Sequence, residues 1–296
     1  MQARRAVEIR AALFGLDFRA PGAPDEHEAG SAPALSIVVP MYDEIGGAVD
    51  LIEEIASAIG PTAHEIIVVD DASTDGTAEA LARSAGQFPS LRILTHGVNA
   101  GQSRAVRTGV LAARASVIVT LDGDGQNDPA DIMALVARLT RDDAPLDLAM
   151  LAGERRARKD VASKKTASRL ANWVRSNLLN DGAADTGCGL KAFYRTAYLR
   201  LPYFDHAHRY LPALMRREGF VVEFAPVGHR PRAHGRSKYT NLGRLGVAFR
   251  DLQGVLWLKA RARSPEWISE VQPERAYASM EPNDKPRGAA LQESRQ

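Results

Sequence analysis

Short runs of consecutive apolar residues alternate along the first half of the chain with segments in which apolar residues recur every three or four positions. The runs have the length of buried strands, and the spaced segments have the periodicity of helices that cover a sheet on one side. Strands are predicted at 35–40, 64–70, 91–95, 116–121 and 146–153, and helices at 47–59, 77–85, 102–115 and 129–141. This alternation favours a parallel, right-handed doubly wound α/β sheet.

The two ends of the chain differ in composition from this α/β segment. Residues 17–34 are rich in proline, alanine, glycine and acidic residues, which is typical of a flexible lead-in. The sequence beyond Pro265 is polar with scattered prolines, which is typical of disorder. We therefore predict a flexible N-terminal segment at 1–33, an α/β domain at 34–241, an amphipathic helical segment at 242–263 and a disordered tail at 264–296.

The formal net charge of +2 conceals a strong asymmetry along the chain. Residues 1–150 contain 11 Lys and Arg against 22 Asp and Glu, a net charge of −11. Residues 151–263 contain 23 against 8, a net charge of +15. A segment this basic is expected to meet an anionic partner, such as a nucleic acid, a lipid phosphate, an anionic membrane face or a nucleoside diphosphate.

Cysteine content and hydropathy exclude other classes of protein. The single cysteine, Cys188, excludes an internal disulfide framework and is expected to be a small buried apolar residue. Glu8 and Arg10 interrupt the apolar positions near the N-terminus, so we expect no secretion signal. No stretch reaches about 18 uncharged apolar residues, so we expect no helix that spans a membrane.

The most informative chemistry lies in Leu121-Asp122-Gly123-Asp124-Gly125-Gln126, directly after the fourth predicted strand. Open α/β sheets bind ligands at the carboxyl ends of their strands. Two carboxylates one residue apart, followed by an amide, suit Mg²⁺ or Mn²⁺ with positions left open for diphosphate oxygens. A polar turn without a ligand is the alternative interpretation of these six residues.

Further motifs occur in a specific order around this one. They are Val39-Pro40-Met41-Tyr42-Asp43-Glu44, the segment Ile66 to Thr77, Gly153-Glu154-Arg155, Asp185 to Lys191, and His229 to Tyr239. In this order the chain resembles the inverting family 2 glycosyltransferases, most closely the polyprenyl-phosphate group that includes the dolichyl-phosphate mannosyltransferases and bacterial undecaprenyl-phosphate enzymes. The resemblance covers about residues 34–259. It implies an α/β GT-A fold, with a Rossmann-like doubly wound mixed sheet and C-terminal amphipathic helices.

The resemblance also implies roles for individual residues. Residues for the nucleotide sugar are Pro40, Tyr42, Glu44, Val69, Asp71, Asp122, Gly123, Asp124, Gln126, Arg155, Arg232 and Lys238, with Asp71 accepting a hydrogen bond from the base. The metal ligands implied are Asp122, Asp124 and Gln126. Gly123 stands where the family usually has alanine, and we expect no consequence because only a small side chain is needed. Glu154 likewise replaces the threonine of a Gly-Thr-Arg motif.

A phosphate acceptor reduces the need for a catalytic base, because a phosphomonoester with a second pKa near ~6 is already largely dianionic at neutral pH. The implied catalytic residues are Asp122, Asp124, Asp185 and Arg155. Asp185 would orient the acceptor or take a residual proton, or it is simply a turn residue. The residues implied for the acceptor phosphate are Arg155, Lys164, Arg169, Arg232 and Lys238. A solvated helix face is an equal alternative for Lys164, Lys165 and Arg169, and we expect His229 and His234 to be structural loop residues.

A lipid acceptor requires contact with a membrane. Leu245, Phe249, Leu252 and Leu256 fall on one helical stripe, with Trp257 beside it and basic residues around it. This pattern predicts an interfacial helix, and a helix that packs into the core is the alternative. We expect a cytoplasmic protein attached peripherally to the inner face of the cytoplasmic membrane.

Two other classes of protein fit the residues less well. A nucleotidyltransferase should carry a glycine-rich basic loop after the first strand, whereas residues 41–44 are acidic. An RNA-binding protein should have aromatic residues among its basic ones, and residues 154–172 contain none. We therefore predict no nucleic-acid partner and a transfer, with inversion, of a sugar from a UDP-sugar or GDP-mannose to a polyprenyl phosphate. A family 2 transferase with another lipid or cell-envelope glycan acceptor is the alternative, and the oligomeric state stays open.

Overall fold

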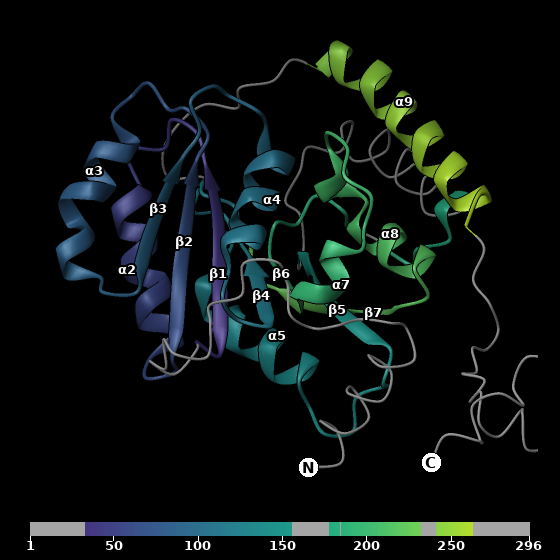
Figure 1. Cartoon of the computed structure of the whole chain (residues 1–296), viewed down its shortest axis with the longest axis horizontal. Coiled ribbons are helices and arrows are strands. Elements are labelled where there is room, and N and C mark those ends of the chain that lie inside the picture. Colours follow the sequence, from purple (N-terminus) through teal and green to yellow (C-terminus); the bar gives the residue numbers. More distant parts are fainter. Residues whose placement is uncertain (1–32, 156–177, 184, 232–240, 263–296) are drawn as a thin grey trace, which may run out of the picture. The chain divides into compact units, whose positions relative to one another are not determined.

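A computed structural model describes residues 33–155, 178–183, 185–231 and 241–262. These residues form a seven-stranded sheet of order β3-β2-β1-β4-β6-β5-β7 with helices on both faces (Figure 1). The strands are β1 (Leu35–Met41), β2 (His64–Asp70), β3 (Leu91–Thr95), β4 (Val117–Thr120), β5 (Leu148–Arg155), β6 (Lys191–Tyr194) and β7 (Val221–Val227). The helices are α2 (Ala48–Ile59), α3 (Thr77–Ser84), α4 (Gln102–Ala112), α5 (Ile132–Leu139), α7 (Arg195–Leu199), α8 (Leu211–Arg217) and α9 (Asn241–Ala260), with short 3-10 turns η1 (Ala85–Gln87), η2 (Pro129–Asp131) and η3 (Ala207–Arg209).

The five predicted strands are confirmed to within two residues at each end. The parallel arrangement predicted for these five strands is confirmed, and β6, a strand that was not predicted, runs antiparallel between β4 and β5. The mixed sheet implied by the resemblance is the one observed. The other six strands share one direction, so β1, β2, β4, β5 and β7 end at the same edge where β6 begins.

The central strands are continuous apolar runs because both faces of the sheet are covered. Side chains alternate between the faces of a strand, so Ile37 and Val39 of β1 point to one side and Val38 to the other. The first side packs against α2 and α5 through residues such as Ile52 and Leu135. The second side packs against α4, α7 and α8. Burial on both sides fixes the sheet, and with it the positions of the loops at its carboxyl edge.

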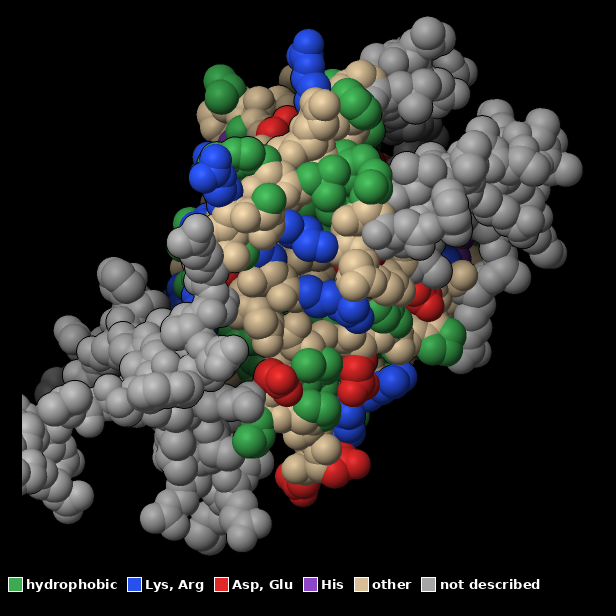
Figure 2. Space-filling model, turned by 90° about the vertical axis from the view of Figure 1, so that its right-hand side faces the viewer, with side chains coloured by type: hydrophobic (Ala, Val, Ile, Leu, Met, Phe, Trp, Pro, Cys, Tyr) green, Lys and Arg blue, Asp and Glu red, His purple; other side chains and the backbone are tan. Residues whose placement is uncertain are grey.

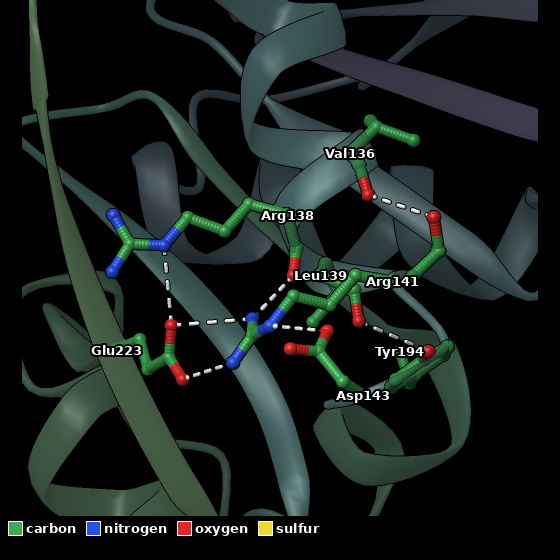
Figure 3. A network of polar contacts seen from close by, with 8 residues as sticks. Val136, Arg138, Leu139, Arg141, Asp143, Tyr194 and Glu223 are labelled. Carbon is green, nitrogen blue, oxygen red and sulfur yellow. Dashed lines mark hydrogen bonds and ion pairs between the residues drawn. The ribbon is translucent and has the colours of Figure 1, made fainter. Parts of the chain in front are cut away.

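A network of ion pairs links α5 and β7 at the edge of the sheet where the parallel strands begin (Figure 3). Glu223 of β7 accepts hydrogen bonds from Arg138 at 3.2 Å and from Arg141 at 2.6 Å, and Arg141 also pairs with Asp143 at 3.3 Å. These arginines follow the end of α5 or lie in its last turn. The network therefore joins the end of α5 to β7, away from the edge where the strands end.

Helix α9 contributes to the core rather than standing apart from it. Val255 is fully buried in the second core, and Leu252 and Leu256 pack against it. In contrast, 61% of Phe249 and 61% of Trp257 is exposed. The predicted single stripe is therefore wrong in part, because Leu252 and Leu256 face inward whereas Phe249 faces outward. The side chain of Leu245 lies outside the described residues. Among the described helices, none is long and apolar enough to cross a bilayer.

Candidate active site at the carboxyl edge of the sheet

The structure brings the described candidate residues together at the edge where the parallel strands end. Pro40, Tyr42 and Glu44 lie at or after the end of β1, Val69 and Asp71 at the end of β2, Asp122 to Gln126 after β4, and Arg155 at the end of β5, with Asp185 in the segment before β6. Lys164, Lys165, Arg169, Arg232, His234 and Lys238 lie outside the described residues. Ligands of open α/β sheets bind at this edge, so the location fits a binding site.

The loops after β1 and β2 are held together by hydrogen bonds. The backbone N–H of Asp43 donates to Ser73 Oγ at 2.8 Å, and that of Thr74 donates to Asp43 Oδ1 at 2.7 Å. Asp43 and Ala72 adopt left-handed backbone conformations, which are costly for residues other than glycine. Such strain persists only where surrounding contacts hold it. These loops form a fixed frame that leaves 36% of Tyr42 exposed at the edge.

Asp71 anchors the loop that follows β3. Its carboxylate accepts hydrogen bonds from the backbone N–H groups of Ala100 and Gly101 at 2.9 and 2.7 Å, and it lies 2.7 Å from His96 Nδ1. Only 3% of Asp71 is exposed. The carboxylate therefore has an evident structural task, and its contact with a nucleobase stays a prediction.

Asp122 is the most perturbed acid of the described site. Burial, followed by repulsion from Asp124, raises the pKa of the Asp122 carboxyl to about 6. Gln102 Nε2, in the first turn of α4, donates to Asp122 Oδ1 at 2.7 Å, and the backbone N–H of Asp122 donates to Asn127 Oδ1 at 3.2 Å. A Cβ atom at Gly189 would lie 2.2 Å from the carboxyl carbon of Asp122, so only glycine fits beside this carboxylate.

These residues fit a divalent cation. Desolvation and then the charge of Asp124 disfavour the ionised form of Asp122, and a bound cation would offset both effects. The backbone N–H of Gln126 donates to Asp124 Oδ1 at 3.1 Å, which holds the amide residue close to the pair. In the described part of the chain no group of three or more His, Cys, Asp or Glu is arranged for a metal. A Mg²⁺ ion held by this pair would complete its coordination with oxygens of a bound phosphate, as is usual in phosphate sites.

Gly123 corrects one sequence-based expectation. A Cβ atom at this position would lie 2.8 Å from the carbonyl oxygen of Pro40 and 2.7 Å from Met41 Cγ. The first of these atoms belongs to the backbone of β1 and cannot turn aside. The expectation that any small side chain would fit is wrong, because even a methyl group requires the loop to move away from β1.

Arg155 and Asp185 form a nearly enclosed ion pair. Arg155 Nε and Nη2 donate to the two carboxylate oxygens of Asp185 at 2.5 and 2.7 Å. The exposed fractions of the two side chains are 11% and 17%. Burial alone would raise the pKa of Asp185, but the hydrogen bonds and charge of Arg155 outweigh it and lower that pKa. Asp185 is therefore held as an anion, which suits orientation of a substrate better than proton uptake, and both catalytic roles stay predictions.

Two residues of this site were not predicted as site residues. One is Gln102, the hydrogen-bond partner of Asp122. The other is Lys191, which is 4% exposed, donates to the carbonyl oxygen of Cys188 and has a pKa that burial lowers. A lysine in an otherwise apolar strand is the available signal, because lysine is almost never fully buried without a partner. Cys188 itself is buried, as predicted.

The half-buried carboxylates that follow β4 and the arginine that ends β5 lie at the carboxyl edge of a mixed sheet, and this sheet has the fold of the GT-A glycosyltransferases. A solved structure supports this fold assignment. Glucosyl-3-phosphoglycerate synthase from Mycobacterium tuberculosis, in complex with Mn²⁺, UDP and glucosyl-3-phosphoglycerate, superposes with a TM-score of 0.59 over 79% of this chain and 82% of that chain. The sequence identity is 18%, so this likeness shows the fold alone.

Residues 36–201 match the family described as "Glycosyl transferase family 2", and the chain belongs to this family. Dodecaprenyl-phosphate galacturonate synthase of Rhizobium johnstonii is 34% identical over 80% of this chain and 71% of its own length. Undecaprenyl-phosphate 4-deoxy-4-formamido-L-arabinose transferase of Pseudomonas fluorescens is 29% identical over 73% of this chain. The chain spans 63% of the length of that second relative.

Proposed function

We propose that this protein is a metal-dependent, inverting glycosyltransferase that moves one sugar from a nucleoside diphosphate sugar, a UDP-sugar or GDP-mannose, to a polyprenyl phosphate. The observation that carries the proposal is the half-buried Asp122 beside Asp124, with its raised pKa, at the edge where the strands end. An acid perturbed in this way beside a second carboxylate is expected at a functional site, and a bound cation would offset both charges.

The acceptor class is inferred from the relatives. Both relatives described above are named for the addition of a sugar to a polyprenyl phosphate. They differ in the sugar, a galacturonate in one and a formamido-arabinose in the other, so the sugar cannot be carried over. A family 2 transferase with a different lipid or glycan acceptor is the second candidate.

The residues act on donor and acceptor in distinct ways. Asp122, Asp124 and Gln126 would hold Mg²⁺ or Mn²⁺. When bound, this ion offsets the charge of the departing nucleoside diphosphate. The acceptor phosphate is already an anion and attacks the anomeric carbon from the face opposite the leaving group, so the configuration inverts. Asp185, kept ionised by Arg155, would orient the acceptor. Arg155, Arg232 and Lys238 would bind phosphate oxygens, for which the arginine fork is well suited.

Contact with a membrane surface would come from the outward face of α9. Phe249 and Trp257 are largely exposed, and the guanidinium of Arg261 lies 5.9 Å from the ring centroid of Trp257. Figure 2 views the side on which α9 and α8 lie in Figure 1 and shows hydrophobic side chains next to Lys and Arg on that side. Apolar rings beside cations suit the interface of an anionic membrane. This supports peripheral attachment to the inner face of the cytoplasmic membrane.

The direct test is transfer of radiolabel from a panel of UDP-sugars and GDP-mannose to extracted polyprenyl phosphates, with Mn²⁺ or Mg²⁺ present. The proposal expects label in the organic phase for one donor, and its loss in Asp124→Asn. Label that appears only in a water-soluble glycan would favour the second candidate. Transfer at full rate in EDTA would refute the metal dependence.

A further inference from the structure

The segment after β7 is bonded to the loop that carries the carboxylate pair. The backbone N–H of Arg230 donates to the carbonyl oxygen of Gln126 at 2.9 Å, and His229 forms an antiparallel bridge with Asn127. One residue earlier, the N–H of Gly228 donates to Asp131 Oδ2 at 2.6 Å. The loop that follows β4 is therefore paired with a segment about a hundred residues away in the sequence.

The side chain of Arg230 adds two ion pairs to this backbone pairing. Its Nη2 donates to Asp128 Oδ1 at 2.8 Å, and its Nη1 donates to Glu54 Oε2 of α2 at 2.5 Å. Asp128 comes two residues after Gln126 and caps η2 through the N–H of Ala130. Arg230 thus contacts the loop through its backbone N–H at Gln126 and through its guanidinium at Asp128, and the same guanidinium reaches helix α2 at Glu54.

The position of Arg230 indicates that its side chain contributes through the charge and the hydrogen bonds of its guanidinium rather than through packing. Its side chain is 42% exposed and lies at the rim of a hollow of about 620 Å³, whose lining includes the carboxylates of Asp50, Glu53, Glu54 and Asp128. Arginine bridges two carboxylates with separate N–H groups, which a lysine ammonium does less well. Removing the guanidinium would leave the acids of this hollow facing one another and would take away the link between Asp128 and Glu54, while the bonds of Gly228 to Asp131 and of Gln102 to Asp122 remain.

We propose that Arg230 is a positioning residue that fixes the loop carrying Asp124 and Gln126, through its bonds to Gln126, Asp128 and Glu54, and thereby sets the geometry in which this chain takes up its divalent cation. The inference rests on the proposed function for the identity of the ligand. Loss of a residue that hydrogen-bonds to metal ligands and orients them typically lowers the metal affinity by about 10- to 100-fold.

Two measurements on the full chain test this proposal. The first is hydrogen exchange of peptides that cover residues 122–131 without metal, and the second is the affinity for Mn²⁺ in the presence of UDP, followed by the electron paramagnetic resonance of free Mn²⁺. In Arg230→Gln we expect faster exchange in 122–131 and about tenfold weaker Mn²⁺ binding. Arg230→Lys should recover part of both effects, because it keeps the charge and loses the fork.

The matched control is Arg138→Gln, which removes an arginine of similar exposure, 46%, from an ion pair at the opposite edge of the sheet. It should change neither the exchange of 122–131 nor the Mn²⁺ affinity. Unchanged exchange in Arg230→Gln overturns the positioning role, and so does unchanged Mn²⁺ affinity in a protein whose wild type binds the ion. If wild type binds no Mn²⁺ with UDP while the exchange still responds to Arg230→Gln, the metal dependence of the proposed function fails and the positioning of the loop stands.

Discussion

The ionised carboxylate of Asp122 should lower the stability of the metal-free protein, although the same carboxylate is proposed to bind the cation. The substitution Asp122→Asn tests this cost to stability. The unfolded chain ionises this carboxyl at its ordinary pKa of 3.8, whereas the folded protein does so at about 6. Between these values the folded state holds a proton that the unfolded state has released. Stability is therefore lost as the pH rises through this window, and the loss is complete above it.

The magnitude follows from the shift. A difference of about 2.2 units corresponds to about 3 kcal/mol of unfolding free energy at pH 8, at about 1.4 kcal/mol per unit. At pH 5 the folded group is mostly protonated, and the same linkage relation leaves about 1.6 kcal/mol of that cost. Asn keeps the shape and cannot ionise. Relative to wild type, Asp122→Asn should therefore gain about 1.4 kcal/mol more stability at pH 8 than at pH 5.

The assay is urea unfolding at both pH values with EDTA present, so that no cation offsets the charge. Asp185→Asn is the control with the opposite sign. Because Arg155 lowers the pKa of Asp185, this carboxylate contributes stability that is present above its unfolded pKa and is lost as the pH falls through the folded one. Its replacement should cost stability at pH 8. If the stability difference between Asp122→Asn and wild type is the same at pH 5 and pH 8, the reasoning about the buried charge is refuted.

Three further variants test the site and the surface. Asp124→Asn should lower turnover at least ~10²-fold, which is the scale of one lost preorganised electrostatic contact. Initial rates measured across a series of Mn²⁺ concentrations check this. A rate near that of wild type would show that Asp124 is not a metal ligand. Gly123→Ala should destabilise the fold by about 1–3 kcal/mol, because its methyl group meets the backbone of Pro40, and a denaturation midpoint equal to that of wild type would contradict this contact. Phe249→Glu should weaken sedimentation with anionic liposomes more than the matched surface substitution Gln253→Glu. Both substitutions add a negative charge, but only Phe249→Glu also removes an exposed aromatic ring. If Phe249→Glu sediments like wild type, the membrane contact lies elsewhere.

The central strands could be predicted because their burial on both faces produces uninterrupted apolar runs. Strand β6 could not, since it has four residues and begins with the charged Lys191. Its direction is set by pairing with β4 and β5, partners that lie far away in the sequence. The side of α9 that packs against the core could not be predicted either. Apolar residues occur around the whole helix, and their periodicity alone does not indicate which of them contact the core.

The candidate site, like the fold, could be predicted only in part from the sequence. Strand ends located the carboxylates of Asp122 and Asp124, because a loop after a parallel strand must emerge at the binding edge. Gln102 and Arg230 were not predicted to contact this loop, since each reaches it from a distant segment through the tertiary structure. The clash at Gly123 depends on the distance between β1 and the loop, which no local pattern encodes.

The junction of β4 and β6 has a consequence for how specificity could change. Thr120 of β4 pairs with Lys191 of β6, and its hydroxyl donates to the carbonyl oxygen of Gly189 at 2.8 Å. On one side of this seam lies the acidic half of the chain, and on the other the basic half. The two halves also meet through the ion pairs of Glu223 with Arg138 and of Arg230 with Glu54, so an exchange of halves between related proteins has to keep these pairs. Chimeras joined between α5 and β5 would test which half selects the donor and which selects the acceptor.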